Sequence, residues 1–249
     1  MKHYSAYITV GLTLTLILMV LLLPITNYII GMTFFGKVPK LYNVTLAQFF
    51  FTQASYPLLG KPYPYAHYQL ARTYFIQGDL QGAIREANNE LTLHPELSKS
   101  YYLLALTYGY NHQEDLAIKT FTTYIEKNPG TWAARNDKAW LQFRIGDIDG
   151  AIATLTPVID TNKGNAWVQN SYGVMLMNKE RYSEAKVALT YAKTTSDHMT
   201  EKDWGHAYPG NDPRVYADGL SAMKASIASN LILAEEKLQL CTKQSTCKK

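Results

Sequence analysis

The chain repeats itself with a period of 34 residues, and this period constrains its fold more than any other feature. The stretches "GDLQGAIREANNEL" at 78–91 and "GDIDGAIATLTPVI" at 146–159 begin almost alike, two periods apart. Two recurring positions hold a small residue in every period. They are Ala71, Ala105, Ala139 and Gly173, and Ala83, Ala117, Ala151 and Ala185. Such periodicity predicts a stack of similar units, each burying a face against the next.

Each period has the pattern of two antiparallel helices. Apolar residues recur at helical spacing before and after Gly78. Gly78 can adopt the left-handed conformation that ends a helix, and Asp79 follows where a turn is expected. Small residues at Ala71 and Ala83 allow the two helices to approach closely. Pro95 ends the unit because proline cannot continue a helix.

These features together resemble the tetratricopeptide repeat (TPR) family. The first repeat carries the resemblance most fully, with Leu70, Ala71, Tyr74, Gly78, Ala83 and Pro95. The resemblance implies an all-α, right-handed α-solenoid of four helix-turn-helix repeats at 64–97, 98–131, 132–165 and 166–198. Some positions depart from the family pattern. His112 and Glu180 stand where the pattern has Gly, and Lys163 and Asp197 stand where it has Pro.

Both ends of such an array need a covering helix, because a terminal unit otherwise exposes the face that a neighbour would bury. We assign 37–63 to a linker and an N-terminal capping helix that includes 43–56. We assign 199–240 to a loop and a C-terminal capping helix. Asp212 and Pro213 mark the start of this last helix, since they suit the cap and the first helical position. Residues 241–249 form a basic tail with both cysteines.

The N-terminal region 1–36 is apolar, with no charged residue from Tyr4 to Gly36. Because about 20 apolar residues suffice to cross a bilayer, the sequence predicts one N-terminal transmembrane helix before the solenoid. A cleaved signal peptide is an alternative, but no small-residue cleavage site precedes Lys37. A buried helix of a soluble protein is a further alternative.

The flanking charges hardly decide on which side of the membrane the repeats lie. Lys2 precedes the apolar segment, and Lys37 and Lys40 follow it. Cys241 and Cys247 can form a small disulfide loop in an oxidising compartment, although the sequence leaves their pairing open. We therefore expect a single-pass membrane protein whose soluble domain is extracytoplasmic.

The net charge of +4 does not indicate a nucleic-acid partner. Seven of the 24 basic residues lie in 1–40 and 237–249, which contain no acid. Removing these seven leaves 17 basic against 20 acidic residues in the body, which therefore carries no net positive charge.

In the resembling family, the first helix of each repeat lines the concave side of the solenoid. Projected onto this chain, the resemblance implies a partner-binding groove of aromatic, amide and cationic residues. The groove residues are Tyr65, Tyr68, Arg72, Lys99, Tyr102, Leu106, Tyr110, Asn136, Trp140, Arg144, Trp167, Asn170 and Met177, with Phe75 and Val174 beside them. Aromatic and arginine residues dominate many interfaces, yet rings on a helix also pack within the core, so both interpretations stay open.

The sequence contains no phosphate-binding loop, nucleophile elbow or paired metal motif, and we expect no enzyme activity and no cofactor. The favoured hypothesis is a membrane-anchored adaptor or scaffold that binds a protein or peptide in its groove. A structural or oligomerising component that uses its convex or end surfaces is the alternative. A metal protein or enzyme centred on residues 198–206 is a remote one, based on His198, Asp203 and His206.

Overall fold

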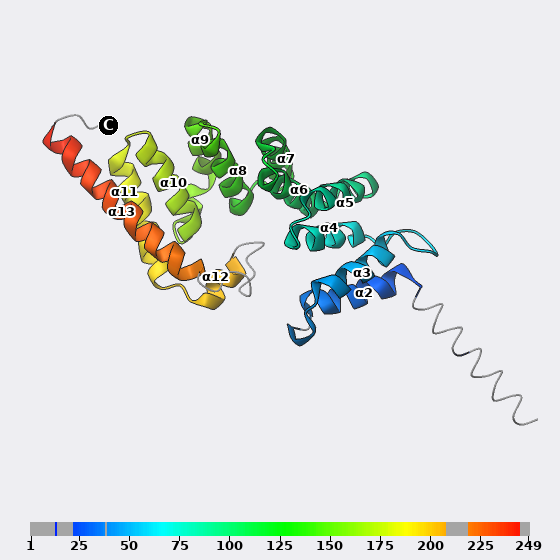
Figure 1. Cartoon of the computed structure of the whole chain (residues 1–249). Helices are drawn as coiled ribbons and strands as arrows, with labels where there is room; N and C mark the ends of the chain where they lie inside the picture. Colours follow the sequence, from blue (N-terminus) through cyan, green and yellow to red (C-terminus); the bar gives the residue numbers. More distant parts are fainter. Residues whose placement is uncertain (1–12, 14–21, 38, 208–218, 245–249) are drawn as a thin grey trace, which may run out of the picture. The chain divides into compact units, whose positions relative to one another are not determined.

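The computed structural model describes residues 13, 22–37, 39–207 and 219–244, and within them it contains helices and no strand (Figure 1). The chain divides into two compact units, residues 1–120 and 121–249, and each is described by itself. The helices of the first unit are α2 (Pro24–Met32), η1 (Thr33–Lys37), η2 (Pro39–Leu41), α3 (Val44–Ser55), α4 (Ala66–Ile76), α5 (Leu80–Leu93) and α6 (Ser98–Tyr110). Helix α7 (Glu114–Lys127) contains the unit boundary, and α8 (Trp132–Arg144), α9 (Ile148–Ile159), η3 (Asp160–Asn162), α10 (Ala166–Asn178), α11 (Tyr182–Asp197), α12 (Glu201–Ala207) and α13 (Gly219–Lys243) follow it.

The first unit begins with a helical hairpin, α2 and α3. Phe51 of α3 is fully buried and packs against Tyr28 of α2 and Phe35 of η1. Gly31 allows this approach, because a Cβ there would lie 2.6 Å from the Phe51 ring. The side chain of Asn43 caps α3 by accepting a 3.0 Å hydrogen bond from the Leu46 amide. The helix covers 44–55, and Phe49 points away from its core and is 57% exposed.

This hairpin corrects the prediction for the N-terminal region. Residues 24–37 do not continue one long apolar helix, because Leu23 is extended (ψ 134°) and a new helix starts at Pro24. Asn27 is buried, as expected for a helix that packs against protein. Among the described residues no helix combines the length and apolarity needed to cross a bilayer, which contradicts the predicted single-pass membrane protein with an extracytoplasmic domain. Residues 4–12 and 14–21 of the predicted segment lie outside the described residues.

Successive helices of the middle of the chain pack in pairs. Helices α4 and α5 pack together within 64–97, α8 and α9 within 132–165, and α10 and α11 within 166–198, while α6 and α7 lie within 98–131. The repeated Gly-Asp pair has the same role in two of them. Gly78 and Gly146 have φ of 81° and 84°, and Asp79 and Asp147 then cap α5 and α9.

The turns that depart from the family pattern adopt the same backbone conformation without glycine. His112, between α6 and α7, has a φ of 55°, and Glu180, between α10 and α11, has a φ of 61°. The turns therefore form, at the cost of left-handed strain in residues with a Cβ.

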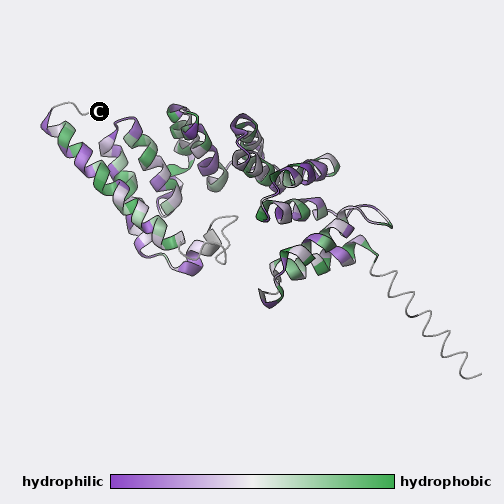
Figure 2. Ribbon diagram, viewed as in Figure 1, coloured by the Kyte–Doolittle hydropathy of each residue, from purple (hydrophilic) through white to green (hydrophobic). Residues whose placement is uncertain are grey.

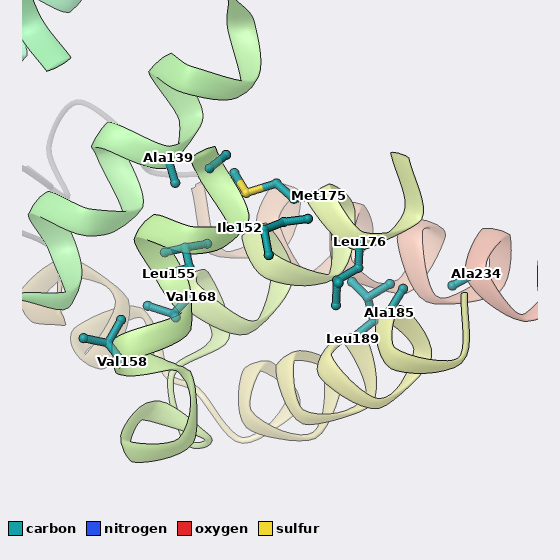
Figure 3. Close-up of a cluster of buried hydrophobic side chains, with 11 residues drawn as sticks. Ala139, Ile152, Leu155, Val158, Val168, Met175, Leu176, Ala185, Leu189 and Ala234 are labelled. Carbon is teal, nitrogen blue, oxygen red and sulfur yellow. The ribbon is translucent and has the colours of Figure 1, made fainter. Parts of the chain in front are cut away.

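The core of the second unit shows why the recurring small residues are needed (Figure 3). Ala139, Ala151 and Ala185 are fully buried where neighbouring helices meet. A Cβ on Gly173 of α10 would lie 2.6 Å from Leu189 of α11, so glycine permits the closest approach in this pair. Larger residues at these positions would separate the helices.

Helix α13 covers the last pair. Its buried residues Leu220, Ile227 and Ala234 recur every seven positions and pack mainly against α11. The predicted start of this helix, with Asp212 and Pro213, lies outside the described residues. Cys241 is buried near the end of α13 and carries no free thiol, whereas Cys247 lies outside the described residues.

Candidate partner-binding surface

We call the predicted groove residues on the first helices of the pairs the inner face. It comprises two parts, one on α4 and α6 of the first unit and one on α8 and α10 of the second. Most of its side chains retain some exposure. The exposed residues are Lys99, Tyr110 and Arg144. The half-buried residues are Tyr65, Tyr68, Arg72, Leu106, Trp140, Trp167, Asn170 and Met177. The buried residues are Tyr102 and Asn136.

Arg72 of α4 is held in place by neighbours that are not acidic. Its guanidinium carbon lies 4.6 Å from the centre of the Phe35 ring and 5.9 Å from that of Tyr68. Its Nη1 donates a 2.9 Å hydrogen bond to the side-chain oxygen of Gln69. No carboxylate of the described residues forms an ion pair with it. Arg72 is thus an oriented cation, able to receive a carboxylate in bidentate fashion.

Aromatic rings flank this cation along the same part of the inner face. Tyr65 contacts Tyr68 edge to face, with ring centres 6.3 Å apart. Phe75 makes the same kind of contact with Tyr110 of α6 at 5.3 Å. Tyr110 is 62% exposed, which makes it the most accessible ring of the predicted set. Such surfaces combine large contact areas with little conformational freedom to lose on binding.

The start of α4 depends on a residue from the following helix. Tyr65 has a left-handed φ of 67° and offers no side-chain cap. Glu90 of α5 replaces it, because its carboxylate accepts hydrogen bonds from the amides of Tyr65 and Tyr68 at 2.9 and 3.0 Å. A carboxylate at a helix N-terminus also complements the helix dipole. Glu90 is therefore a structural residue that positions two tyrosines of the inner face.

A second buried acid, Glu86, joins α3, α4 and α5. Its carboxylate accepts hydrogen bonds from the Tyr56 hydroxyl and from Arg85 Nε, and lies 2.8 Å from His67 Nδ1. Burial alone would raise the pKa of Glu86, but these donors outweigh it and hold the pKa below its ordinary value. The cluster fixes the N-terminal hairpin to the first repeat.

In the second unit, tryptophans join α8 to α10. Trp140 Nε1 donates a 2.8 Å hydrogen bond to Ser171 Oγ, and the ring packs against the core. Trp132 stacks on Trp167 with ring centres 6.1 Å apart and an interplanar angle of 29°. Both contacts hold successive first helices side by side, so these rings pack with one face and leave only part of their surface for a partner.

The two predicted amide residues differ. Asn136 is 5% exposed, and its Oδ1 accepts no hydrogen bond from any described residue, which is unfavourable for a buried acceptor. Asn170 is paired within the chain, because its Oδ1 accepts a 3.0 Å hydrogen bond from Asn230 Nδ2 of α13. Helix α13 therefore borders the inner face of this unit.

Sequence reasoning missed two contributors to the surface. Phe35 was assigned to the predicted membrane segment, so nothing indicated its contact with Arg72. Asn230 was assigned to a covering helix. A second row of apolar residues on that helix, with Leu233 and Leu240, was the signal that the helix has a second apolar side.

Two residues in the segment of the remote metal or enzyme hypothesis, Asp203 and Trp204, have structural roles. Asp203 accepts hydrogen bonds from both the amide and the hydroxyl of Thr200, which caps α12. Trp204 is buried against Gly219. His198 is exposed, and the side chain of His206 lies outside the described residues. No group of three or more potential metal ligands occurs in the part of the chain that is described.

Comparison with known proteins agrees with this architecture. Residues 102–166 match the tetratricopeptide repeat family. The structure resembles MamA of strain AMB-1, with a TM-score of 0.58 and 18% identity over 71% of this chain and 93% of that protein. It also resembles residues 41 to the end of MamA from Desulfovibrio magneticus RS-1, with a TM-score of 0.50 and 13% identity over 70% and 93% of the two chains.

A third similar structure is YrrB, described as a TPR protein with an unusual peptide-binding site. The TM-score is 0.55, with 20% identity over 68% of this chain and 86% of YrrB. At these identities the likeness establishes the fold alone. No curated protein sequence matches the chain.

Proposed function

We propose that this chain is a non-catalytic scaffold that binds a protein or peptide segment on the inner face of its helix pairs. The TPR match of residues 102–166 and the fold shared with YrrB support this proposal. Tyr110, Lys99 and Arg144 are exposed, so a partner can contact their side chains.

The observation that carries the proposal is the environment of Arg72. A half-buried guanidinium normally lies beside a carboxylate, but here Phe35, Tyr68 and Gln69 orient it instead. Two buried acids of the neighbouring helix α5 are committed elsewhere, Glu90 to the start of α4 and Glu86 to its own cluster. A partner carboxylate therefore completes the site.

The test begins with chemical cross-linking of the protein in its native cells, followed by mass spectrometry to identify the partner. Binding of that purified partner is then measured with the full chain carrying Arg72→Glu or Tyr110→Ser. We expect each substitution to weaken binding at least tenfold. Leu93→Ser is the matched control, because Leu93 is 48% exposed but lies on a second helix, α5. Unchanged binding in both inner-face variants would overturn the proposal.

A structural or oligomerising role is the second candidate, and the N-terminal hairpin favours it. Ile29 of α2 and Leu46 and Phe49 of α3 are 51%, 41% and 57% exposed, so three large apolar side chains of the hairpin are accessible to a second copy of the chain. Light scattering of the full chain and of Phe49→Asp distinguishes the two. Self-association that Phe49→Asp abolishes, with no effect of Arg72→Glu, would favour this second role.

A further inference from the structure

The loop between α3 and α4 carries two adjacent leucines that the rest of the first unit hardly covers. Leu58 is 79% exposed and Leu59 is 47% exposed. Gly60 follows with a left-handed φ of 88°, which bends the chain directly after them, and Lys61 comes next. We call Leu58, Leu59 and Lys61 the loop tip. An exposed apolar patch of this kind normally marks a site of interaction.

The N-terminal hairpin holds this loop in place. The amide of Tyr63 donates a 3.1 Å hydrogen bond to the carbonyl oxygen of Ala54, near the end of α3. The Tyr63 ring also packs against that of Tyr28 of α2, with ring centres 4.7 Å apart. The exposure of the two leucines is therefore a property of a packed loop.

The loop tip lies beside the start of α2 (Figure 1). A Cβ on Gly60 would lie 3.9 Å from Cγ of Pro24, which is van der Waals contact. Leu23 and Ile25, on either side of Pro24, are 41% and 45% exposed. Figure 2 shows hydrophobic residues recurring along α2 and α3. One end of the hairpin thus presents exposed aliphatic side chains from two segments, and residues 4–22, which precede this end, contain no charge.

The charge at the loop tip is positive and has no acidic counterpart in the hairpin. Lys61 is exposed and forms no ion pair with a described residue. The first acid of the chain is Asp79, so α2, α3, α4 and the loops between them contain none. Glu86 and Glu90 of α5 are buried and hydrogen-bonded, and Glu96, after α5, lies 3.5 Å from a histidine.

We propose that the loop tip binds the surface of a lipid bilayer with anionic headgroups. Leu58 and Leu59 insert between the headgroups, and Lys61 lies at the level of the phosphates. A bilayer surrounds a projecting side chain without a shaped pocket, which a folded partner would have to supply. Tyr56 and Tyr63, near the two ends of the loop, suit the boundary between headgroups and hydrocarbon. This contact lies at the bilayer surface and requires no helix that crosses it.

The test places the environment-sensitive fluorescent amino acid dansylalanine at position 58 of the full chain, and in a matched variant at position 76. Ile76 is 45% exposed but lies at the opposite end of α4 from the loop. The vesicles are an equimolar mixture of phosphatidylcholine and anionic phosphatidylglycerol. We expect them to shift the emission from position 58 to shorter wavelengths, and brominated acyl chains to quench it at least twofold. Neither change should occur at position 76.

The charge is tested in the chain labelled at position 58. Lys61→Glu should raise the concentration of anionic vesicles that gives half of the emission change at least threefold, because it removes the attraction to the headgroups. Lys179→Glu is the matched control, since Lys179 is an exposed lysine of α10 in the second unit, and it should change this concentration less than twofold. Circular dichroism spectra identical to that of the unsubstituted chain exclude unfolding of these variants.

Other outcomes overturn the inference. Short-wavelength emission from position 58 before vesicles are added would show that this chain or a second copy of it covers the loop tip. Equal quenching at positions 58 and 76, or equal binding of anionic vesicles and of vesicles of phosphatidylcholine alone, would also reject it. No response to either kind of vesicle would reject it in favour of a protein partner at the loop tip. None of these results bears on the inner face, which Arg72→Glu tests separately.

Discussion

His67 Nδ1 lies 2.8 Å from Glu86 Oε2, and both side chains are almost completely buried. This contact, with the hydrogen bond from Tyr56, joins the N-terminal hairpin to the first repeat. It therefore ties α3, whose Phe51 packs against Phe35, to α4, whose Arg72 lies over the Phe35 ring.

Glu86→Gln should destabilise the first unit by about 1–3 kcal/mol at neutral pH, because buried donors lose a charged acceptor. The pKa of Glu86 lies below its ordinary value of 4.5. Its ionised form therefore stabilises the fold above pH 4.5, and this contribution disappears as the pH falls through the lowered folded-state pKa. Hydrogen exchange of α3, α4 and α5 at pH 7 and in steps below pH 4.5 measures both effects. Glu86→Gln should remove this part of the acid sensitivity.

Arg85→Gln serves as the control for that experiment. Arg85 also donates to Glu86, but 56% of its side chain is exposed, so water can replace its hydrogen bond. Arg85→Gln should lower the free energy of unfolding of the first unit by well under half as much as Glu86→Gln does. Equal costs for the two variants would mean that the cluster owes its stability to surface charge rather than to burial.

Glu180→Gly should stabilise the second unit by about 0.5 kcal/mol. Glu180 has a φ of 61°, where a Cβ is strained, and glycine removes this strain while adding some freedom to the unfolded chain. The reverse change at the equivalent turn, Gly146→Ala, should cost about 1 kcal/mol, since Gly146 has a φ of 84°. Urea denaturation of the two variants provides the measurement, and effects of the same sign would refute this account of the turns.

The helix pairs could be predicted from the sequence because their determinants are local. Gly78 and Asp79 specify a turn and a cap within two residues, and the small residue at Ala83 is required wherever two such helices meet. The turns at His112 and Glu180 show the limit of this reasoning, since packing imposed the left-handed conformation on residues that do not prefer it.

The surroundings of the inner face could not be predicted, because they depend on contacts distant in sequence. Asn170 is paired with Asn230, 60 residues away, and Arg72 is oriented by Phe35, which lay in a segment interpreted as one membrane helix. An uncharged run of residues is compatible with a membrane span or with a packed hairpin. The extended Leu23, the buried Asn27 and the packing of Gly31 on Phe51 distinguish the two for residues 24–37.

Gly173→Ala should destabilise the second unit by about 1–3 kcal/mol through overpacking. The added methyl group would lie 2.6 Å from Leu189 and 3.3 Å from the Ala185 carbonyl oxygen. Thermal unfolding of this variant should be compared with that of Gly164→Ala, where a methyl group meets nothing within 4 Å. A Gly164→Ala variant as unstable as Gly173→Ala would show that helix packing is not the cause.

The contact between Trp140 and Ser171 should contribute about 1 kcal/mol to the free energy of unfolding of the second unit. Trp140→Phe keeps most of the packed ring but removes the N–H that donates the 2.8 Å hydrogen bond. Ser171→Ala removes the acceptor, and because Ser171 is almost fully buried, a water molecule cannot easily take its place. The double variant should therefore lose less stability than the sum of the two single variants, by about the energy of the bond. Urea denaturation of the four proteins closes the cycle. Strictly additive losses of stability would mean that Trp140 joins α8 to α10 by ring packing alone. The indole N–H could then donate its hydrogen bond to a bound partner instead.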